Sequence, residues 1–150
     1  MIKIPEACPA PAIAEVRAAF TLYWCDLPAC LNRIRNALEL VLDDFKVARS
    51  GLDKARRKRN RLSLHHRIEK LEKKKPKLKP ICERMMAVKN LGNAGSHPGD
   101  KVTHDDVFDG FDILERVLED MYSEHPGELA KAVKEINRRK GPRKSKWTRP

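Results

Sequence analysis

The stretch LNRIRNALELVLDDF, residues 31–45, decides the fold. Five of its large apolar residues recur at alternating steps of three and four, and they are Leu31, Ile34, Leu38, Val41 and Phe45. That spacing places them on one stripe of an α-helix, as is typical of a helix that faces the core of a bundle. Pro28 fits the first turn of this helix, where its missing N–H costs little.

The same spacing recurs in four other segments. Stripes run from about Pro11 into the mid-twenties, over residues 64–71 and over 78–88. The last stripe spans 107–121, and Thr103 with Asp106 three residues later predicts the cap of its helix. Pro76 follows the lysines that end the third helix, and Gly92 is predicted to interrupt or kink the fourth. Strand-like alternation is absent, so the sequence predicts an all-α antiparallel bundle of about five helices.

A chain of 150 residues fits one domain with a core of its own. We expect an N-terminal extension over 1–10 and a helical bundle over 11–125. Within the bundle, the highly charged residues 50–62 predict a mobile basic loop. Pro126 and Gly127 end the last stripe, so residues 126–150 are expected to form a basic, partly helical and partly disordered tail.

The positive charge is concentrated in two segments. Residues 51–79 carry a net charge of +10 and residues 129–150 one of +8, which leaves −7 on the rest because the whole chain carries +11. Such segregation favours contact with a polyanion, most often nucleic acid. A solubilising loop and tail is the alternative interpretation.

The cysteines and the apolar runs bear on compartment and cofactors. Cys8, Cys25, Cys30 and Cys82 form no Cys-x-x-Cys pair, and the last three fall in apolar helical stretches, where a reduced thiol acts as a small hydrophobe. We expect no metal and no cofactor, because no two histidines or carboxylates show ligand spacing on one helix face. Signal-peptide and transmembrane patterns are also absent, so a cytoplasmic, non-membrane protein is expected.

The stretch Lys89-Asn90-Leu91-Gly92-Asn93-Ala94-Gly95-Ser96-His97 carries a family resemblance. It resembles the end of the fourth helix in HEPN-type bundles, and most closely the HEPN-related family called domain of unknown function 4145. Further support comes from 32–39, 103–107 and 113–119, so the resemblance covers roughly residues 12–125. It implies the bundle fold, a homodimer with the Asn93–His97 element near its two-fold axis, and membership of bacterial or phage conflict systems, as in antiphage defence.

HEPN-type ribonucleases cleave RNA without metal, with an arginine on the scissile phosphate and a histidine that moves protons. His97 and Asn93 match that pattern, whereas Gly92 stands where the arginine is expected. Lys89 is the nearest cation, but it is a point charge rather than a planar fork. We therefore predict no catalytic residues, with His97, Asn93 and Lys89 as the candidates if the chain is active; otherwise Asn93 and His97 are structural or contact a ligand.

Arginine-to-histidine spacings between residues 59 and 66 also fit the nuclease pattern, but they arise easily by chance in so basic a segment. There, His65 and His66 are expected to be surface residues. Trp147 is an aromatic placed to stack on a base. The predicted nucleic-acid contacts are the basic side chains Arg56, Arg57, Lys58, Arg59, Arg61, Arg138, Arg139, Lys140, Arg143, Lys144 and Lys146.

These observations predict a non-catalytic, HEPN-like module that binds nucleic acid, with RNA favoured over DNA. One alternative is a metal-independent endoribonuclease that uses His97. Another is an interaction module whose basic segments bind an acidic protein partner.

Overall fold

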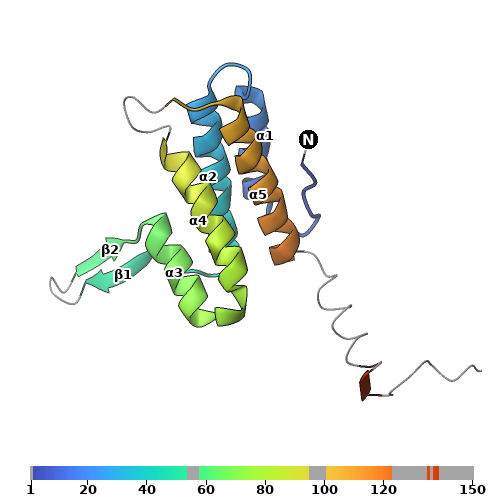
Figure 1. Ribbon diagram of the computed structural model, residues 1–150. Coiled ribbons are helices and arrows are strands. Elements are labelled where there is room, and N and C mark those ends of the chain that lie inside the picture. The colour runs from blue at the N-terminus through green and yellow to red at the C-terminus, as the bar shows by residue number, and fades with distance from the viewer. Residues whose placement is uncertain (1, 54–57, 95–100, 123–134, 136, 139–150) are drawn as a thin grey trace, which may run out of the picture.

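The computed structural model describes residues 2–53, 58–94, 101–122, 135, 137 and 138. Within these residues the main elements are five α-helices and one two-stranded sheet. In chain order they are α1 (Ala10–Leu22), α2 (Leu27–Asp44), β1 (Ser50–Asp53), β2 (Lys58–Arg61), α3 (Leu64–Lys74), the short 3-10 helix η1 (Pro76–Leu78), α4 (Lys79–Ala94) and α5 (His104–Tyr122). The predicted all-α bundle is confirmed, with the small sheet projecting from it (Figure 1).

Helix α2 is the centre of the bundle, because it contacts α1, α4 and α5 along its length and α3 near its end. Leu31, Ile34, Leu38 and Val41 are all buried, as their spacing predicts. Residues of the N-terminal extension also pack on this core: Cys8 is buried, and Ile2 and Ile4 are partly buried. Burial of this continuous apolar stripe is the main force that holds the helices together.

The helix ends follow the local sequence. Thr103 and Asp106 form the predicted reciprocal cap of α5: the Asp106 carboxylate accepts from the Thr103 N–H at 2.8 Å, and the Thr103 hydroxyl accepts from the Asp106 N–H at 3.2 Å. The C-terminal end of α2 also follows its sequence. There the Val47 N–H donates to the Leu42 carbonyl at 2.9 Å, across Lys46, whose φ is 56°. This Schellman-type ending turns the chain sharply away from α2.

The predicted loop over residues 50–62 is wrong in part, because the structure forms a β-hairpin there. Strand β1 pairs antiparallel with β2 in the register Ser50↔Arg61 to Asp53↔Lys58. At its base the Leu62 N–H donates to the Arg49 carbonyl at 2.8 Å, so the two ends of the hairpin meet. The pairing escapes an apolar-period analysis because each strand has only four residues and Leu52 is the only large apolar one.

The predicted interruption at Gly92 is also wrong, since α4 continues to Ala94. Gly92 is buried against α2, and a Cβ built on it would lie 2.6 Å from the Arg35 Cβ. Real side chains essentially never approach that closely. The glycine therefore permits close packing of two helices, and its cost in helix propensity is offset by that contact.

The cysteine prediction holds for two of the three helical positions. Cys30 and Cys82 are buried, whereas Cys25 is exposed beyond the end of α1. Helix α1 ends at Leu22, so Cys25 lies in the turn that follows the helix.

Candidate nucleic-acid interface

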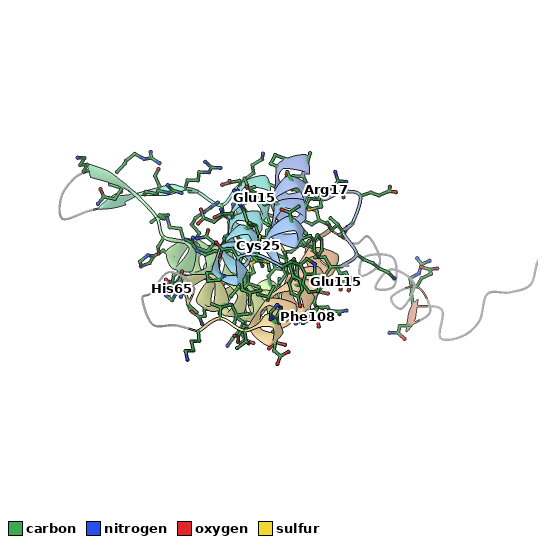
Figure 2. The ribbon with its side chains drawn as sticks, turned by 90° about the horizontal axis from the view of Figure 1, so that it is seen from above. Glu15, Arg17, Cys25, His65, Phe108 and Glu115 are labelled. Atoms are coloured by element: carbon green, nitrogen blue, oxygen red, sulfur yellow. The ribbon has the colours of Figure 1, made fainter. Side chains whose placement is uncertain are left out.

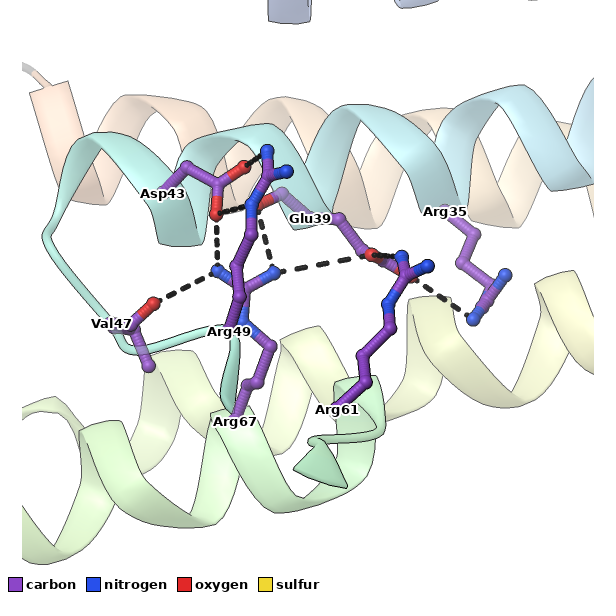
Figure 3. Close-up of polar contacts among 7 residues, drawn as sticks. All are labelled: Arg35, Glu39, Asp43, Val47, Arg49, Arg61 and Arg67. Carbon is purple, nitrogen blue, oxygen red and sulfur yellow. Dashed lines mark hydrogen bonds and ion pairs between the residues drawn. The ribbon is translucent and has the colours of Figure 1, made fainter. Parts of the chain in front are cut away.

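A buried arginine fastens α3 to the end of α2. The Arg67 side chain is only 2 % exposed, and its guanidinium donates to the Asp43 carboxylate at 2.7 Å. It also donates to the backbone carbonyls of Val47, at 3.1 Å, and Glu39, at 3.3 Å (Figure 3). A buried guanidinium requires such partners, because an unpaired charge away from water is strongly unfavourable.

Three more arginines surround the carboxylates of Asp43 and Glu39. Arg49, which precedes β1, donates through Nε to Asp43 at 2.8 Å and through a second nitrogen to the other carboxylate oxygen. Arg61 of β2 lies 3.5 Å from Glu39. Figure 3 also shows Arg35 reaching Glu39 from one turn earlier on α2, at 3.1 Å. These contacts tie both ends of the hairpin to the bundle.

The cluster of Arg35, Arg49, Arg61 and Arg67 around Glu39 and Asp43 is called the arginine cluster below. Four guanidinium groups meet two carboxylates, so the cluster retains an excess of positive charge. The hydrogen bond from Arg49 is the largest cause that lowers the pKa of Asp43, and the charges of Arg67 and Arg49 lower it further against the opposing effect of burial. Asp43 is therefore ionised throughout the neutral range.

The excess charge faces solvent along the hairpin. All four residues of β2 are exposed, and three of them, Lys58, Arg59 and Arg61, are basic. Arg61 is 82 % exposed and Arg49 is 67 % exposed, although each pairs with a carboxylate. Lys58 and Arg59 stand farther out on the strand, and Arg59 contacts the Ser50 hydroxyl at 3.4 Å across the sheet. The exposed basic side chains of β2, Lys58, Arg59 and Arg61, are called the cationic ribbon below, and the arginine cluster holds its base against the bundle.

The structure places only part of the predicted basic set. Lys58, Arg59 and Arg61 lie together on β2, and Arg138 is exposed in a helical stretch, where it pairs with Glu135 at 2.8 Å. The remaining predicted contacts lie outside the described residues: Arg56, Arg57, Arg139, Lys140, Arg143, Lys144 and Lys146. Trp147 lies outside them too.

Sequence reasoning missed Arg35, Arg49 and Arg67. A signal for Arg67 was available: it follows Leu64 by three residues and precedes Leu71 by four, so it occupies a position on the apolar stripe of α3. A cation on such a stripe needs a buried carboxylate partner. Glu39 and Asp43, four residues apart on α2, are carboxylates on one helix face.

Two of the three candidate catalytic residues, Lys89 and Asn93, lie near the end of α4. Lys89 and Asn93 are both half-buried there, and His97 lies outside the described residues. Gly92 faces Arg35 so closely that no side chain fits between α4 and α2. At the position where the resembled nucleases carry arginine, this packing leaves no room for a guanidinium.

The histidines of α3 are surface residues, as expected. His66 Nδ1 lies 2.8 Å from the Ser63 hydroxyl, and His65 lies 3.4 Å from Glu69. Both are exposed, and these local partners account for them without a catalytic role. In the described part of the chain, no group of three or more His, Cys, Asp or Glu side chains is placed to hold a metal ion.

The chain is thus an all-α bundle with a basic hairpin anchored between its second and third helices. Comparison with known families identifies it further: residues 17–139 match the family described as Domain of unknown function (DUF4145), and the chain belongs to that family. No curated protein and no solved structure matches it significantly. Across the described residues, none of the helices is both long and apolar enough to cross a bilayer.

Proposed function

We propose that this protein is a non-catalytic module that binds nucleic acid, with RNA favoured over DNA. The observation that carries the proposal is the cationic ribbon: Lys58 and Arg59 are exposed on a strand whose base is held by the arginine cluster. Phosphate backbones attract such a surface at long range, and each neutralised phosphate releases condensed counterions.

Anchoring of the hairpin supports the proposal. An isolated two-stranded hairpin is marginally stable in water. Here Arg61 pairs with Glu39, Arg49 pairs with Asp43, and the Leu62–Arg49 backbone bond closes the base. Because the base is ordered before binding, less conformational entropy is lost when the basic side chains meet a ligand.

Close packing at Gly92 supports the absence of catalysis. Phosphoryl chemistry in the resembled nucleases needs a cation held on the scissile phosphate, and loss of a positioned donor typically costs about 100- to 1000-fold in rate. Gly92 supplies no such group, and Arg35, the cation packed against it, is paired with Glu39. The endoribonuclease that uses His97, with Asn93 and Lys89, stays the second candidate function.

The resemblance to HEPN-type proteins supports the rest of the proposal. RNA is favoured because the resembled nucleases act on RNA. A homodimer and a role in a bacterial or phage defence system are inferred from the same resemblance, and a cytoplasmic location is proposed from the sequence patterns alone. The alternative ligand of the cationic ribbon is an acidic protein partner, which the experiment below distinguishes from nucleic acid.

The test is fluorescence anisotropy of the full chain with a labelled single-stranded RNA over a range of salt concentrations. Lys58→Gln combined with Arg59→Gln should weaken binding and flatten the log–log salt slope by roughly 1.4, because about two phosphate contacts are lost. The matched control is Lys73→Gln with Lys77→Gln, which removes two exposed charges from α3 and η1. Arg61 is left intact because it also holds the hairpin.

Duplex DNA serves as the competitor in the same assay. RNA binding that resists an equal amount of duplex supports RNA as the ligand. Equal losses in the hairpin and control variants, or an unchanged salt slope in both, would exclude the hairpin as the interface. Absence of RNA and DNA binding, together with capture of a defined acidic protein, would favour the protein-interaction alternative.

A further inference from the structure

An exposed aromatic groove lies between α1 and α5. It has a volume of about 400 Å³ and is lined by Phe20, Tyr23, Trp24, Phe108 and Phe111. Trp24 is 85 % exposed and Phe108 is 54 % exposed, two of the three large apolar residues most open to solvent in the described part of the chain. Figure 2 shows Phe108 on a different side of the bundle from the hairpin.

The aromatic rings that line the groove contact one another. Phe20 and Phe111 stack at 4.6 Å, and Tyr23 contacts both Trp24, at 4.8 Å, and Phe108, at 5.3 Å. Contacts of this kind fix the rings without covering their outer faces. Exposure of so many aromatic atoms in one place is uncommon on a monomer and marks a docking surface.

The surroundings of the groove are acidic. Helix α5 contains seven Asp or Glu residues against one Arg. Asp105 and Asp112 are exposed and stand three residues before and four residues after Phe108, so they share its face of the helix. A platform for nucleic-acid bases is therefore disfavoured, since these carboxylates repel phosphate. The complementary occupant is basic with apolar side chains.

The chain contains such a segment. Residues 129–150 carry a net charge of +8 and include the apolar residues Leu129, Val133, Ile136 and Trp147. They follow α5, which ends at Tyr122, and because the described residues Asn137 and Arg138 are exposed, docking requires this segment to move onto the groove. Phe108 lies about 21 Å back along the helix at 1.5 Å per residue, and an extended chain of about seven residues spans that distance.

A non-helical segment already packs on this side of the bundle. The Lys3 backbone N–H donates to the Glu115 carboxylate at 2.6 Å, one turn along α5 from Phe111, and Ile4 packs against the core. The chain before α1 lies beside α5 in Figure 1. The side of the bundle next to the groove therefore accepts peptide.

We propose that the aromatic groove between α1 and α5 docks the chain's own basic segment, residues 129–150, intramolecularly. The carboxylates of Asp105 and Asp112 attract the basic side chains of this segment, and the rings of Trp24 and Phe108 contact its apolar side chains. Docking of this kind does not depend on nucleic-acid binding, and the assay below contains no nucleic acid.

The two tryptophans of the chain make the test direct. Trp147→Phe leaves Trp24 as the sole tryptophan while keeping an aromatic ring in the basic segment. In the full-length protein at low salt, Trp24 should emit at shorter wavelength than an exposed indole. Its quenching by acrylamide should fall by roughly half, as expected when one of the two ring faces is covered. The reference is the same protein with glutamine at Arg138, Arg139, Lys140, Arg143, Lys144 and Lys146.

Two further variants locate the contact. Asp105→Asn with Asp112→Asn, in the Trp147→Phe background, should restore full quenching of Trp24. Glu72→Gln with Glu83→Gln removes the same charge from α3 and α4 and should leave Trp24 protected. Equal quenching in every variant, or equal loss in this control, would overturn the proposal. Protection that disappears on dilution would overturn the intramolecular assignment, because a second copy would then supply the segment.

Discussion

Gly92→Ala is expected to destabilise the protein although alanine is the better helix former. The new methyl group would lie 2.6 Å from the Arg35 Cβ and 2.9 Å from its Cδ. The Cβ is fixed to the α2 backbone, so rotation of the arginine side chain does not relieve the first contact. Relief requires α4 to move away from α2 by roughly 0.8 Å to reach ordinary contact, and overpacking of this kind costs about 1–3 kcal/mol.

The helix-propensity gain offsets part of that cost. Replacing glycine by alanine inside a helix contributes about 1 kcal/mol. The Arg35 Cβ cannot move without the α2 backbone, so the overpacking cost should lie near the upper end of that range of about 1–3 kcal/mol. The net loss of unfolding free energy should then be about 2 kcal/mol. For a domain of this size that corresponds to a fall in Tm of roughly 4–8 °C.

Circular dichroism during urea and thermal unfolding measures this difference. The matched control is Gly110→Ala, also within a helix, where the nearest neighbour of the new methyl is the Leu31 Cδ2 at 3.1 Å. That atom is the end of a flexible side chain, so Gly110→Ala should cost little or stabilise. Equal stability of Gly92→Ala and wild type would refute the close packing of α4 on α2. The same packing makes Gly92→Arg unsuitable for restoring a nuclease.

Four further outcomes are expected. A thiol reagent at neutral pH should label Cys25 alone in the folded protein, because burial, the largest cause, raises the pKa of the three buried thiols to about 11; mass spectrometry counts the labels. Arg67→Met should lower the unfolding free energy by about 3 kcal/mol, because the buried guanidinium and its ion pair with Asp43 are lost. Asp43 still pairs with Arg49 in this variant, so its carboxylate is not left without a partner. In wild type, the stability from Asp43 is present above its unfolded pKa and lost as pH falls through its lowered folded pKa, so acid unfolding should be less steep in a variant with Asp43→Asn. Finally, wild type and His97→Ala should show the same background cleavage of a structured RNA. Cleavage by wild type that is lost in His97→Ala, at unchanged thermal stability, would favour the endoribonuclease that uses His97.

The sequence predicts the helices better than it predicts the surface between them. Leu31, Ile34, Leu38 and Val41 fall at helical spacing, and one repeating interaction, burial against neighbours, determines both the pattern and the fold. Thr103 and Asp106 are predictable for a similar reason, since the capping contact is local in sequence.

The hairpin and the arginine cluster depend on contacts between distant residues. Arg61 meets Glu39 across 22 positions, and Arg67 meets Asp43 across 24, so neither pairing leaves a periodic signal. Gly92 illustrates the same limit. Its effect on the chain depends on Arg35 of another helix, and a glycine in isolation reads as a helix breaker.

Closure of the hairpin at its base has a consequence for how the domain can diversify. The Leu62 N–H and the Arg49 carbonyl already meet at 2.8 Å, so the bundle on either side is joined whatever lies between them. Loop-closure cost rises only slowly with length, and exposed excursions of this kind tolerate insertion and deletion. Residues 50–61 can therefore be replaced by a short turn, or by a hairpin of different charge, while the helices keep their packing. If the hairpin is the nucleic-acid interface proposed above, ligand preference would then change among related chains through one short segment, while the helices still fold as before.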